Sequence, residues 1–238
     1  PTHRAVMQWV LKVLRKHGLA QGQSVCIDAT TLAANAAMKS LVRRDTGVGY
    51  EEYLRQLAQA EGIENPTQEQ AARLDRKRKK KASNDDWTNP HDPSARITKM
   101  KDGRTKLAHK AEHAVDLADG AVLAVTVQPG DRGDTASYAE TLDAAQREAW
   151  KAHPDGIEEL VLDKGYHSGA VLVDLAERNL RSYVPEPERG RRKWAGKQQE
   201  QRCVYANRRR VRGARSKRLQ KLRGELCERS FAHCYETG

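Results

Sequence analysis

Hydrophobic and polar positions near the start of the chain repeat with the period of a helix. Apolar residues recur every three or four positions over the first eighteen residues, with Lys and Arg between them. We therefore expect an amphipathic helix that ends near Gly18, because glycine is favoured just after the last helical turn. The apolar positions are Val6, Met7, Val10, Leu11 and Leu14.

A short apolar run, SVCID at residues 24–28, comes next and predicts a strand that ends at Asp28. The following TTLAANAAMKSLV predicts a helix. Taken alone, Asp28 is typical of a turn or a helix cap, because an aspartate at a strand end often accepts a hydrogen bond from the next backbone amides. A chemical role for Asp28 therefore needs support from other parts of the chain.

The pattern changes from about residue 45. YEEYLRQLAQAEG has an apolar stripe at helical spacing and predicts a helix. TQEQAARLDRKRKKK predicts another helix, because Thr67 and Gln70 have the spacing of a capping box. That segment ends in a basic run, with seven Lys or Arg and one Asp over residues 73–81. SNDDWTNPHDPSA is rich in turn-forming residues and predicts a loop.

Strand patterns return after residue 100. Two alternating segments flank an Ala-Asp-Gly turn and predict a hairpin. Helical and strand patterns then alternate to the end of the chain. The predicted elements are strands at 107–117 and 121–128, a helix at 135–150, a strand at 157–163, a helix at 168–179, a strand at 180–185 and a long helix at 215–235.

The order of these elements indicates the fold class. With residues 33–100 set aside, it is strand, strand, strand, helix, strand, helix, strand, helix, which is the order of the ribonuclease H-like fold. We expect an α/β protein with a ribonuclease H-like mixed sheet flanked by helices. A mostly helical insertion at 33–100 separates the leading helix and first strand, at 1–32, from the rest of the core, at 101–238.

Two carboxylates are expected at one edge of this sheet. The first strand lies parallel to the fourth in such a fold, so Asp28 and Asp163, which end those strands, meet at their carboxyl ends. The last helix is able to supply a third carboxylate. Crowded carboxylates repel one another, and Mg²⁺, which prefers hard oxygen ligands, removes that cost. Two such ions activate a nucleophile and stabilise the leaving oxygen of a phosphoryl transfer.

The distribution of charge indicates a polyanionic partner. The 238 residues carry a formal net charge of +11, and 38% of them are hydrophobic. Residues 189–223 hold fifteen Lys or Arg and one Glu, a net charge of +14, so the remainder is slightly acidic. Trp194 and Tyr205 lie among these cations and are able to stack on bases or sugars, which favours a surface for nucleic-acid phosphates. A solvated basic loop is the alternative.

Other classes of function are disfavoured. No apolar run approaches the length that spans a bilayer. The four cysteines lack the spacing of a zinc site or a disulfide framework, so we expect a reducing cytoplasm. The absence of a phosphate-loop motif gives no reason to expect ATP. The chain begins without Met, and we expect a piece of a longer protein.

Four segments resemble the DDE transposases of bacterial insertion sequences: IDATTLAANA, TNPHDPSARITKMKDGRTKLAHKAEHAVD, VLDKGYHS and RRRVRGARSKRLQKLRGELCERSFAHCYETG. The resemblance covers the chain from about residue 20 to its end and implies a Transposase-DDE catalytic domain. In that family a D-x-T, a D-K-G-Y and an E-R-S-F-A-H segment carry the catalytic carboxylates. The resemblance therefore implies that Asp28, Asp163 and Glu228 are catalytic and bind Mg²⁺, for which Mn²⁺ substitutes.

The resemblance also implies metal-dependent DNA cleavage and strand transfer. The partners would be double-stranded DNA, as insertion-sequence ends and target, and a second copy of the chain in a homodimer on DNA, at the bacterial nucleoid. The basic run at 73–81 would also hold the DNA backbone. The other residues expected to contact DNA are Lys164, Trp194, Arg208, Arg209, Arg210, Arg212, Lys217 and Arg218.

Several alternatives stay open. Glu225 lies one turn before Glu228 and is the alternative third carboxylate. Asp134 is expected to cap the helix at Thr135, and His167 is either a polar neighbour of the site or a structural histidine. The Tyr and Arg of the family's Y-x-x-R-x-x-x-E pattern are absent before Glu228, which indicates a divergent branch. A nuclease without strand transfer and a truncated chain that binds DNA without cutting are the alternative functions.

Overall fold

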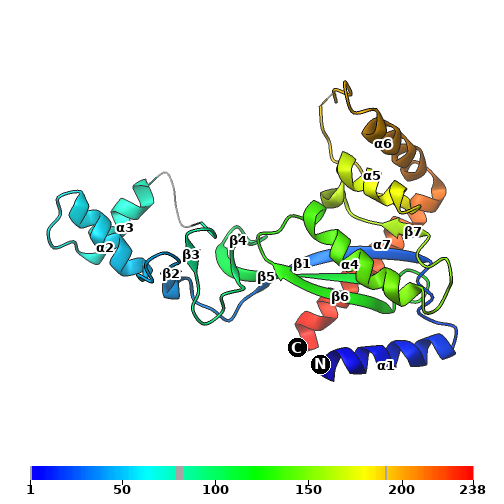
Figure 1. The fold of residues 1–238 in the computed structure, drawn as a ribbon, viewed down its shortest axis with the longest axis horizontal. Coiled ribbons are helices and arrows are strands. Elements are labelled where there is room, and N and C mark those ends of the chain that lie inside the picture. The colour runs from blue at the N-terminus through cyan, green and yellow to red at the C-terminus, as the bar shows by residue number, and fades with distance from the viewer. Residues whose placement is uncertain (1, 79–82, 191, 238) are drawn as a thin grey trace. The chain divides into compact units, whose positions relative to one another are not determined.

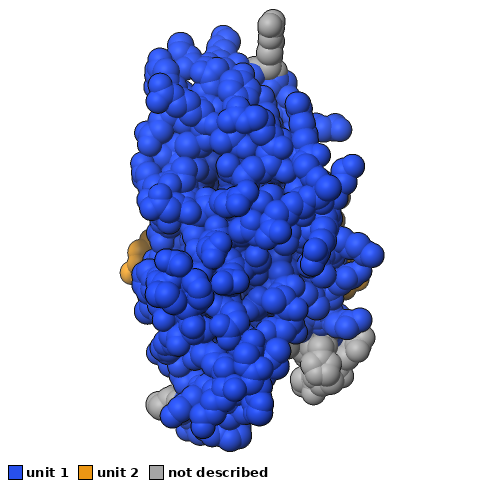
Figure 2. All heavy atoms as spheres, turned by 90° about the vertical axis from the view of Figure 1, so that its right-hand side faces the viewer, with its two compact units in different colours: residues 1–30, 111–127, 133–238 blue, residues 31–110, 128–132 orange. Residues whose placement is uncertain are grey.

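The chain divides into two compact units, which Figure 2 draws in different colours. The structure, a computed structural model, describes residues 2–78, 83–190 and 192–237, with only the backbone for residues 233–237. Unit 1 comprises residues 1–30, 111–127 and 133–238, and unit 2 comprises residues 31–110 and 128–132. Residues 79–81 of the basic run therefore lie outside the described residues, as does residue 191 of the basic segment.

Figure 1 labels the helices and strands of both units. In unit 1 the structure contains α1 (Thr2–Lys16), α4 (Asp134–Ala149), β7 (Glu159–Val161), the short 3₁₀ helix η2 (Lys164–Tyr166), α5 (Gly169–Glu177), β8 (Arg181–Tyr183), α6 (Gln198–Val211) and α7 (Ala214–Thr237). In unit 2 it contains η1 (Met38–Ser40), β2 (Val42–Arg43), α2 (Tyr50–Ala60), α3 (Gln68–Lys77), β3 (Trp87–Thr88) and β4 (Arg96–Lys99). Three longer strands, β1 (Ser24–Ala33), β5 (Thr105–Asp116) and β6 (Val122–Pro129), begin in one unit and end in the other.

The main sheet is mixed, as expected. Its strand order is β4-β5-β1-β7-β8, and β6 also pairs with β5. The pairs β1–β7 and β7–β8 are parallel, whereas β4–β5 is antiparallel. β5 also runs antiparallel to β1, because Leu117 N donates to Ser24 O at one end and Ala34 N donates to Leu107 O at the other. The predicted α/β class and the parallel pairing of the first strand with the strand near residue 160 are confirmed.

The two faces of the unit 1 sheet are buried by different helices, because successive side chains of a strand point to opposite faces. Val25 and Ile27 of β1 belong to a core cluster that includes α1, α4 and α5. Cys26, between them, belongs to a second cluster with Leu219 and Cys227 of α7. The unit 1 part of the sheet is thus covered on both faces (Figure 1), and Cys26 of β1 lies on the face that α7 covers.

The basic segment at 189–223 is largely helical rather than a loop. It contains α6 and the start of α7. The amide of the buried Asn207 on α6 bonds the end of β8: its Oδ1 accepts from Val184 N at 3.1 Å and its Nδ2 donates to Val184 O at 2.8 Å. An amide side chain matches both groups of an extended backbone, so Asn207 fixes α6 against the edge of the sheet.

Unit 2 has its own small core, formed by Leu41, Trp87, Ala95 and Leu107. Tyr50 and Tyr53 of α2 pack edge-on against Trp87, with ring centroids 5.1 and 5.2 Å away. The predicted capping box is present at the start of α3: Gln70 N donates to Thr67 Oγ1, and Thr67 N donates to Gln70 Oε1. This unit combines helices with short strands, whereas the sequence pattern predicts a mostly helical insertion at 33–100.

The predicted helix at TTLAANAAMKSLV is wrong. β1 continues to Ala33, and Met38–Ser40 forms only a 3₁₀ turn. The β-branched Thr30 and Thr31 favour extended backbone, and pairing with β5 extends the strand. Asp28 therefore does not end its strand and caps no helix.

None of the described helices combines the length and the apolar composition needed to cross a membrane.

Substitution of Gly22 tests how tightly unit 1 is packed around this residue. Its φ is +73°, and an added Cβ would lie 2.9 Å from Ala149 Cβ and 3.1 Å from Leu123 Cδ1. We expect Gly22→Ala to lower the free energy of unfolding by about 3 kcal/mol, from backbone strain and overpacking together. Gly18→Ala is the matched control, because Gly18 has a φ of +76° with nothing within 4 Å of an added Cβ. Equal losses in chemical denaturation would contradict the steric contribution.

Candidate active site

The parallel pairing of β1 with β7 brings Asp28 and Asp163 to the same level of the sheet. Ser24 pairs with Glu159, and the last registered pair is Cys26 with Val161. Asp28 and Asp163 each follow that pair by two residues. Beyond it, β7 ends while β1 continues alongside β5, so the two carboxylates lie where the parallel strands separate.

Asp163 is fixed by the tight turn that follows β7. It is the N-cap of η2, and its Oδ1 accepts a hydrogen bond from Gly165 N at 2.6 Å. An added Cβ at Gly165 would lie 2.5 Å from Asp134 Oδ2 and 2.9 Å from Asp163 Oδ1. A side chain at this position would displace at least one of these carboxylates, so glycine allows both of them to approach the turn.

Asp134 has a different position from the one predicted. It is the first residue of α4, whose N-cap is Gly133 without a side-chain hydrogen bond. The carboxylate of Asp134 is directed toward Gly165 and the turn that carries Asp163. A negative charge in the first turn of a helix is favourable, so this carboxylate also suits the helix dipole.

An arginine joins Asp28 to Glu228. Arg223 Nη1 donates to Asp28 Oδ2 at 2.9 Å, and Arg223 Nη2 lies 3.4 Å from Glu228 Oε1. The other oxygen of Asp28 accepts from Ala29 N at 2.8 Å. The Arg223 side chain is only 15% exposed, so its charge acts in a weakly solvated setting.

The pKa of Asp28 reflects this crowding. Burial raises the pKa above its ordinary value, while the Ala29 amide and the Arg223 guanidinium lower it. The neighbouring charges of Asp163 and Glu228 raise it again, and the net shift is upward. Asp163 and Glu228 are therefore both close enough to Asp28 for their charges to act on it.

Helix α7 is held against the strand ends by specific contacts. Gln220 Nε2 donates to Leu162 O at 3.2 Å and to Tyr183 O at 2.9 Å, just beyond β7 and at the end of β8. Cys227 is fully buried, and its hydrogen bond with Cys26 of β1, together with burial, raises the pKa of its thiol. These contacts fix the turn of helix that carries Arg223 and Glu228.

The two candidate glutamates on α7 have different neighbours. Glu228 forms an ion pair with Arg223, the residue that also binds Asp28. Glu225 lies 3.6 Å from Lys221 on its own helix, and both glutamate side chains are exposed. The geometry therefore associates Glu228, rather than Glu225, with Asp28.

A buried glutamate that the sequence analysis missed lies near these residues. Glu112 on β5 is fully buried and accepts hydrogen bonds from Ser137 Oγ, from Thr141 Oγ1 at 2.6 Å and from Tyr166 OH at 3.1 Å. Burial and the charges of Glu112, Asp134 and Asp28 raise the pKa of Tyr166. The available signal in the sequence was the acidic Glu112 within the predicted strand KAEHAV, where a small or apolar side chain is expected.

The two buried histidines have separate surroundings. His113 stacks on Phe231 of α7 with a centroid distance of 4.1 Å, and burial lowers its pKa to about 4. His167 is fully buried, and burial lowers its pKa, with a contribution from Arg192. Its Nδ1 lies 3.3 Å from Arg192 Nη2, whereas its Nε2 has no hydrogen-bond partner among the described residues.

The residues predicted to contact DNA fall into two groups. Some are engaged within the protein: Arg208 pairs with Glu186, Arg210 donates to Ser182, and the Trp194 ring lies 6.0 Å from that of Tyr205. The others have exposed side chains that are available to a partner. They are Lys164, Arg209, Arg212, Lys217 and Arg218.

No three His, Cys, Asp or Glu side chains among the described residues have the arrangement of a metal site. Comparison with known proteins finds no match for the chain among protein-family models, curated proteins or solved structures. The assignment of a function therefore depends on the residues themselves.

The Glu112 network supports the core behind the site. We expect Glu112→Ala to lower the free energy of unfolding by about 3 kcal/mol or more, because three buried hydroxyls lose their acceptor. Glu112→Gln keeps an acceptor oxygen, so its free energy of unfolding should fall by less than that of Glu112→Ala. The exposed Glu158, replaced by Ala, is the control and should change stability by less than about 0.5 kcal/mol. Equal losses for the two alanine variants in chemical denaturation would refute a structural role for this network.

His113 makes stability depend on pH. Its folded pKa of about 4 lies below the ordinary value of 6.5, so the unfolded chain binds the proton first as pH falls. This contribution is fully present above about pH 6.5 and should decrease by about 3 kcal/mol as pH falls to about 4. His113→Gln should show a shallower pH dependence in denaturant titrations. The exposed His17, replaced in the same way, should keep the wild-type dependence.

Proposed function

We propose that this chain is the catalytic part of a DDE-type DNA transposase. The observation that carries the proposal is the convergence of Asp28, Asp163 and Glu228, from two parallel strands and a covering helix. The sequence motifs of that family occur at these three positions. The reaction would be cleavage of DNA at the ends of an insertion sequence, followed by strand transfer.

The topology supports a ribonuclease H-like core for this enzyme. In such a core the first strand lies parallel to the fourth. Here β1 pairs in parallel with β7, which follows β5 and β6 in the chain order of unit 1. In the sheet, β1 lies between the antiparallel β5 and the parallel β7, and α7 packs against the face of β1 that carries Cys26.

Asp28, Asp163 and Glu228 offer hard carboxylate oxygens, the ligand type that a divalent cation such as Mg²⁺ or Mn²⁺ prefers, although the three side chains do not have the arrangement of a metal site in this structure. Burial is the main cause that raises the pKa of Asp28, and the charges of Asp163 and Glu228 add to it; a cation among them would relieve that repulsion. When bound, such a cation supplies Lewis-acid stabilisation of the oxygens in a phosphoryl transfer. Arg223 offsets part of the charge of Asp28 and Glu228, and it would release at least one of them when the cation binds.

The exposed cations on α6, on α7 and after β7 are suited to the DNA backbone. Arg209, Arg212, Lys217 and Arg218 lie around the connection between α6 and α7, and Lys164 follows Asp163 directly. Contacts of this kind set the position of DNA but read no sequence. A homodimer on DNA remains a prediction.

The decisive test is DNA cleavage with matched carboxylate variants. In Mg²⁺, with DNA that carries the element's ends, we expect Asp163→Asn and Glu228→Gln each to slow cleavage on the order of a thousandfold, because each removes a ligand charge. Glu225→Gln is the control and should retain cleavage, since the ion pair that Glu225 forms among the described residues is with Lys221 on its own helix.

The products distinguish the alternatives. Joining of the cleaved ends to a second DNA supports a transposase, whereas cleavage without joining supports a nuclease. Binding without cleavage by the unmodified chain in Mg²⁺ and in Mn²⁺ would refute an active enzyme and support a DNA-binding chain. Cleavage that survives Asp163→Asn would refute the assignment of these carboxylates.

A further inference from the structure

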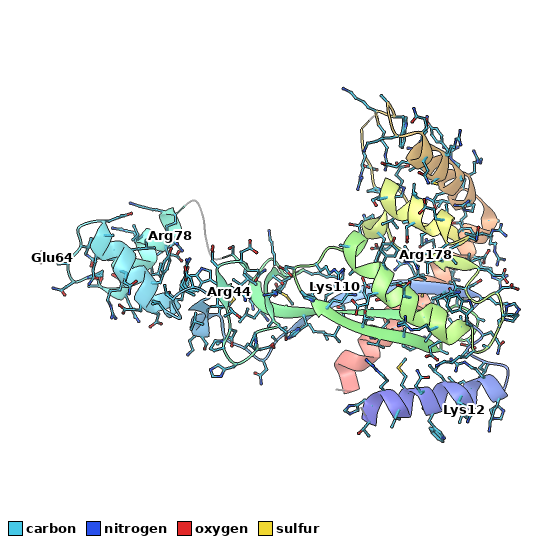
Figure 3. All side chains as sticks on the ribbon, in the orientation of Figure 1. Lys12, Arg44, Glu64, Arg78, Lys110 and Arg178 are labelled. Atoms are coloured by element: carbon cyan, nitrogen blue, oxygen red, sulfur yellow. The ribbon has the colours of Figure 1, made fainter. Side chains whose placement is uncertain are left out.

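Unit 2 contains a charged pocket that the proposed chemistry does not use. Its volume is about 590 Å³, and its lining includes three arginines, among them Arg44, which Figure 3 labels. Two aspartates and an asparagine complete the polar lining. Every lining residue belongs to unit 2, so the pocket is a property of that unit alone.

Asn84 builds one wall of the pocket. Its Oδ1 accepts from Ile97 N at 2.7 Å, and its Nδ2 donates to Ile97 O at 3.0 Å, so the side chain is fixed against β4. The same Nδ2 lies 3.0 Å from Asp131 Oδ2. Asn84 therefore ties the loop before β3 and the segment at 128–132 to β4, so hydrogen bonds hold this wall of the pocket in place.

Gly130 brings the segment at 128–132 close to the β4–β5 hairpin. An added Cβ would lie 2.5 Å from Ala108 O and 2.7 Å from Thr98 Oγ1. Only glycine allows this approach. The segment is thereby held against the face of the hairpin that carries Arg96, which pairs with Ala108 in the sheet register.

Two arginines of the pocket have N–H donors without a hydrogen-bond partner among the described residues. Arg44 Nε donates to Asn84 O and Trp87 O, both at 3.2 Å, which orients the guanidinium. Its two terminal nitrogens have no hydrogen bond with any described residue. Arg96 forms no side-chain hydrogen bond or ion pair with the described residues. Planar guanidinium groups with free, oriented donors suit the oxygens of a phosphate.

The pocket continues into a row of cations. Thr98 of β4 pairs with Lys106 of β5, and Met100 N donates to Arg104 O in the turn. Paired residues of an antiparallel hairpin share a face, and every second residue of a strand returns to that face. Lys106 and Arg104, both exposed, therefore follow Arg96 along one face of the hairpin. A row of separated cations matches a chain of phosphates rather than one free anion.

The two aspartates of the pocket repel any anion, but they disfavour free phosphate more than a nucleic-acid backbone. Asp131 is bonded to Asn84, but Asp85 has no side-chain hydrogen bond or ion pair with the described residues. A carboxylate at the rim weakens the binding of a small, highly charged anion such as free phosphate. A polymer backbone held at several points tolerates that repulsion, because the contacts to Arg96, Lys106 and Arg104 add to those of Arg44.

We propose that this pocket, with Arg44 and Arg96, binds a backbone phosphate of a nucleic acid and that the β4–β5 hairpin carries the adjoining phosphates. The choice of DNA as the nucleic acid rests on the proposed function; the rest of the proposal does not depend on it. It assigns unit 2 a direct part in holding that DNA.

The test measures the affinity of the full chain for a labelled DNA duplex by fluorescence anisotropy, without divalent cation. Arg96→Ala should weaken binding roughly tenfold, because a charge-assisted contact is lost, and should reduce the slope of log affinity against log salt by about 1. Arg96→Lys keeps the charge but loses the planar donors and should have an intermediate effect. Arg96 has no partner within the described protein, so these variants should keep the wild-type melting temperature.

Arg55→Ala is the matched control, because it removes the same charge from the same unit, on α2 and outside the pocket. It should change DNA affinity less than twofold. Equal effects of the Arg96 and Arg55 variants would overturn the proposal, since only net charge would then matter. Free phosphate is the other ligand with the same anion chemistry, and calorimetry with inorganic phosphate alone tests it. The proposal would also be overturned if Arg96→Ala abolished saturable phosphate binding but left the affinity for DNA unchanged.

The outcome is separate from that of the proposed function. Loss of DNA affinity in Arg96→Ala supports the pocket even if the chain cleaves nothing. Cleavage that depends on Asp163, with unchanged DNA affinity in Arg96→Ala, would retain the enzyme and refute the pocket.

Discussion

The parallel register of β1 with β7 is the constraint on which the candidate site depends. It sets two aspartates, 135 positions apart in the sequence, at one level of the sheet, each two residues beyond the last pair. The carboxyl ends of parallel strands carry sites in open α/β sheets because side chains from different strands converge where the hydrogen bonding stops. The long β1 modifies this arrangement, since it continues past Asp28 beside β5 and keeps the Asp28 backbone within the sheet.

Convergence of like charges has an electrostatic cost that the surrounding residues offset. Arg223 offsets part of the charge of Asp28 and Glu228, and its pair with Asp28 is mostly shielded from water, where an ion pair is stronger than at the surface. Glu112 is stabilised differently, by three hydroxyl donors from α4 and η2. Gly165 contributes by having no side chain, so that Asp134 and Asp163 approach the same turn. Asp28, Asp163 and Glu112 thus each have their own hydrogen-bond or ion-pair partner, as buried polar groups require.

The basic residues have a divided role. Within the segment at 189–223, Arg208 and Arg210 bind Glu186 and Ser182 and so help to fix α6, while other cations remain exposed. Trp194 and Tyr205, expected to stack on bases, lie beside each other and close to arginines of the same segment. In unit 2, the aromatic cluster around Trp87 gives a small core of its own. A local core of this kind allows unit 2 to present a fixed charged pocket.

Local sequence pattern determined most elements of this protein: the amphipathic α1, α2 and α3, the β5–β6 hairpin, and the alternation of strands and helices that ends in α7. These follow from periodicity and from local signals such as Thr67 and Gln70, which act within a few residues. The element order was also enough to infer that the strands before Asp28 and Asp163 lie side by side. The helix expected after Asp28 was wrong because pairing with β5, a long-range interaction, outweighed the local preference of the alanine-rich segment. Only the tertiary structure decided that Arg223 bridges Asp28 and Glu228, that Glu112 is buried beside Tyr166, and that Asn84 and Gly130 close a pocket. Each of these depends on groups distant in sequence meeting in space, and no local pattern encodes that meeting.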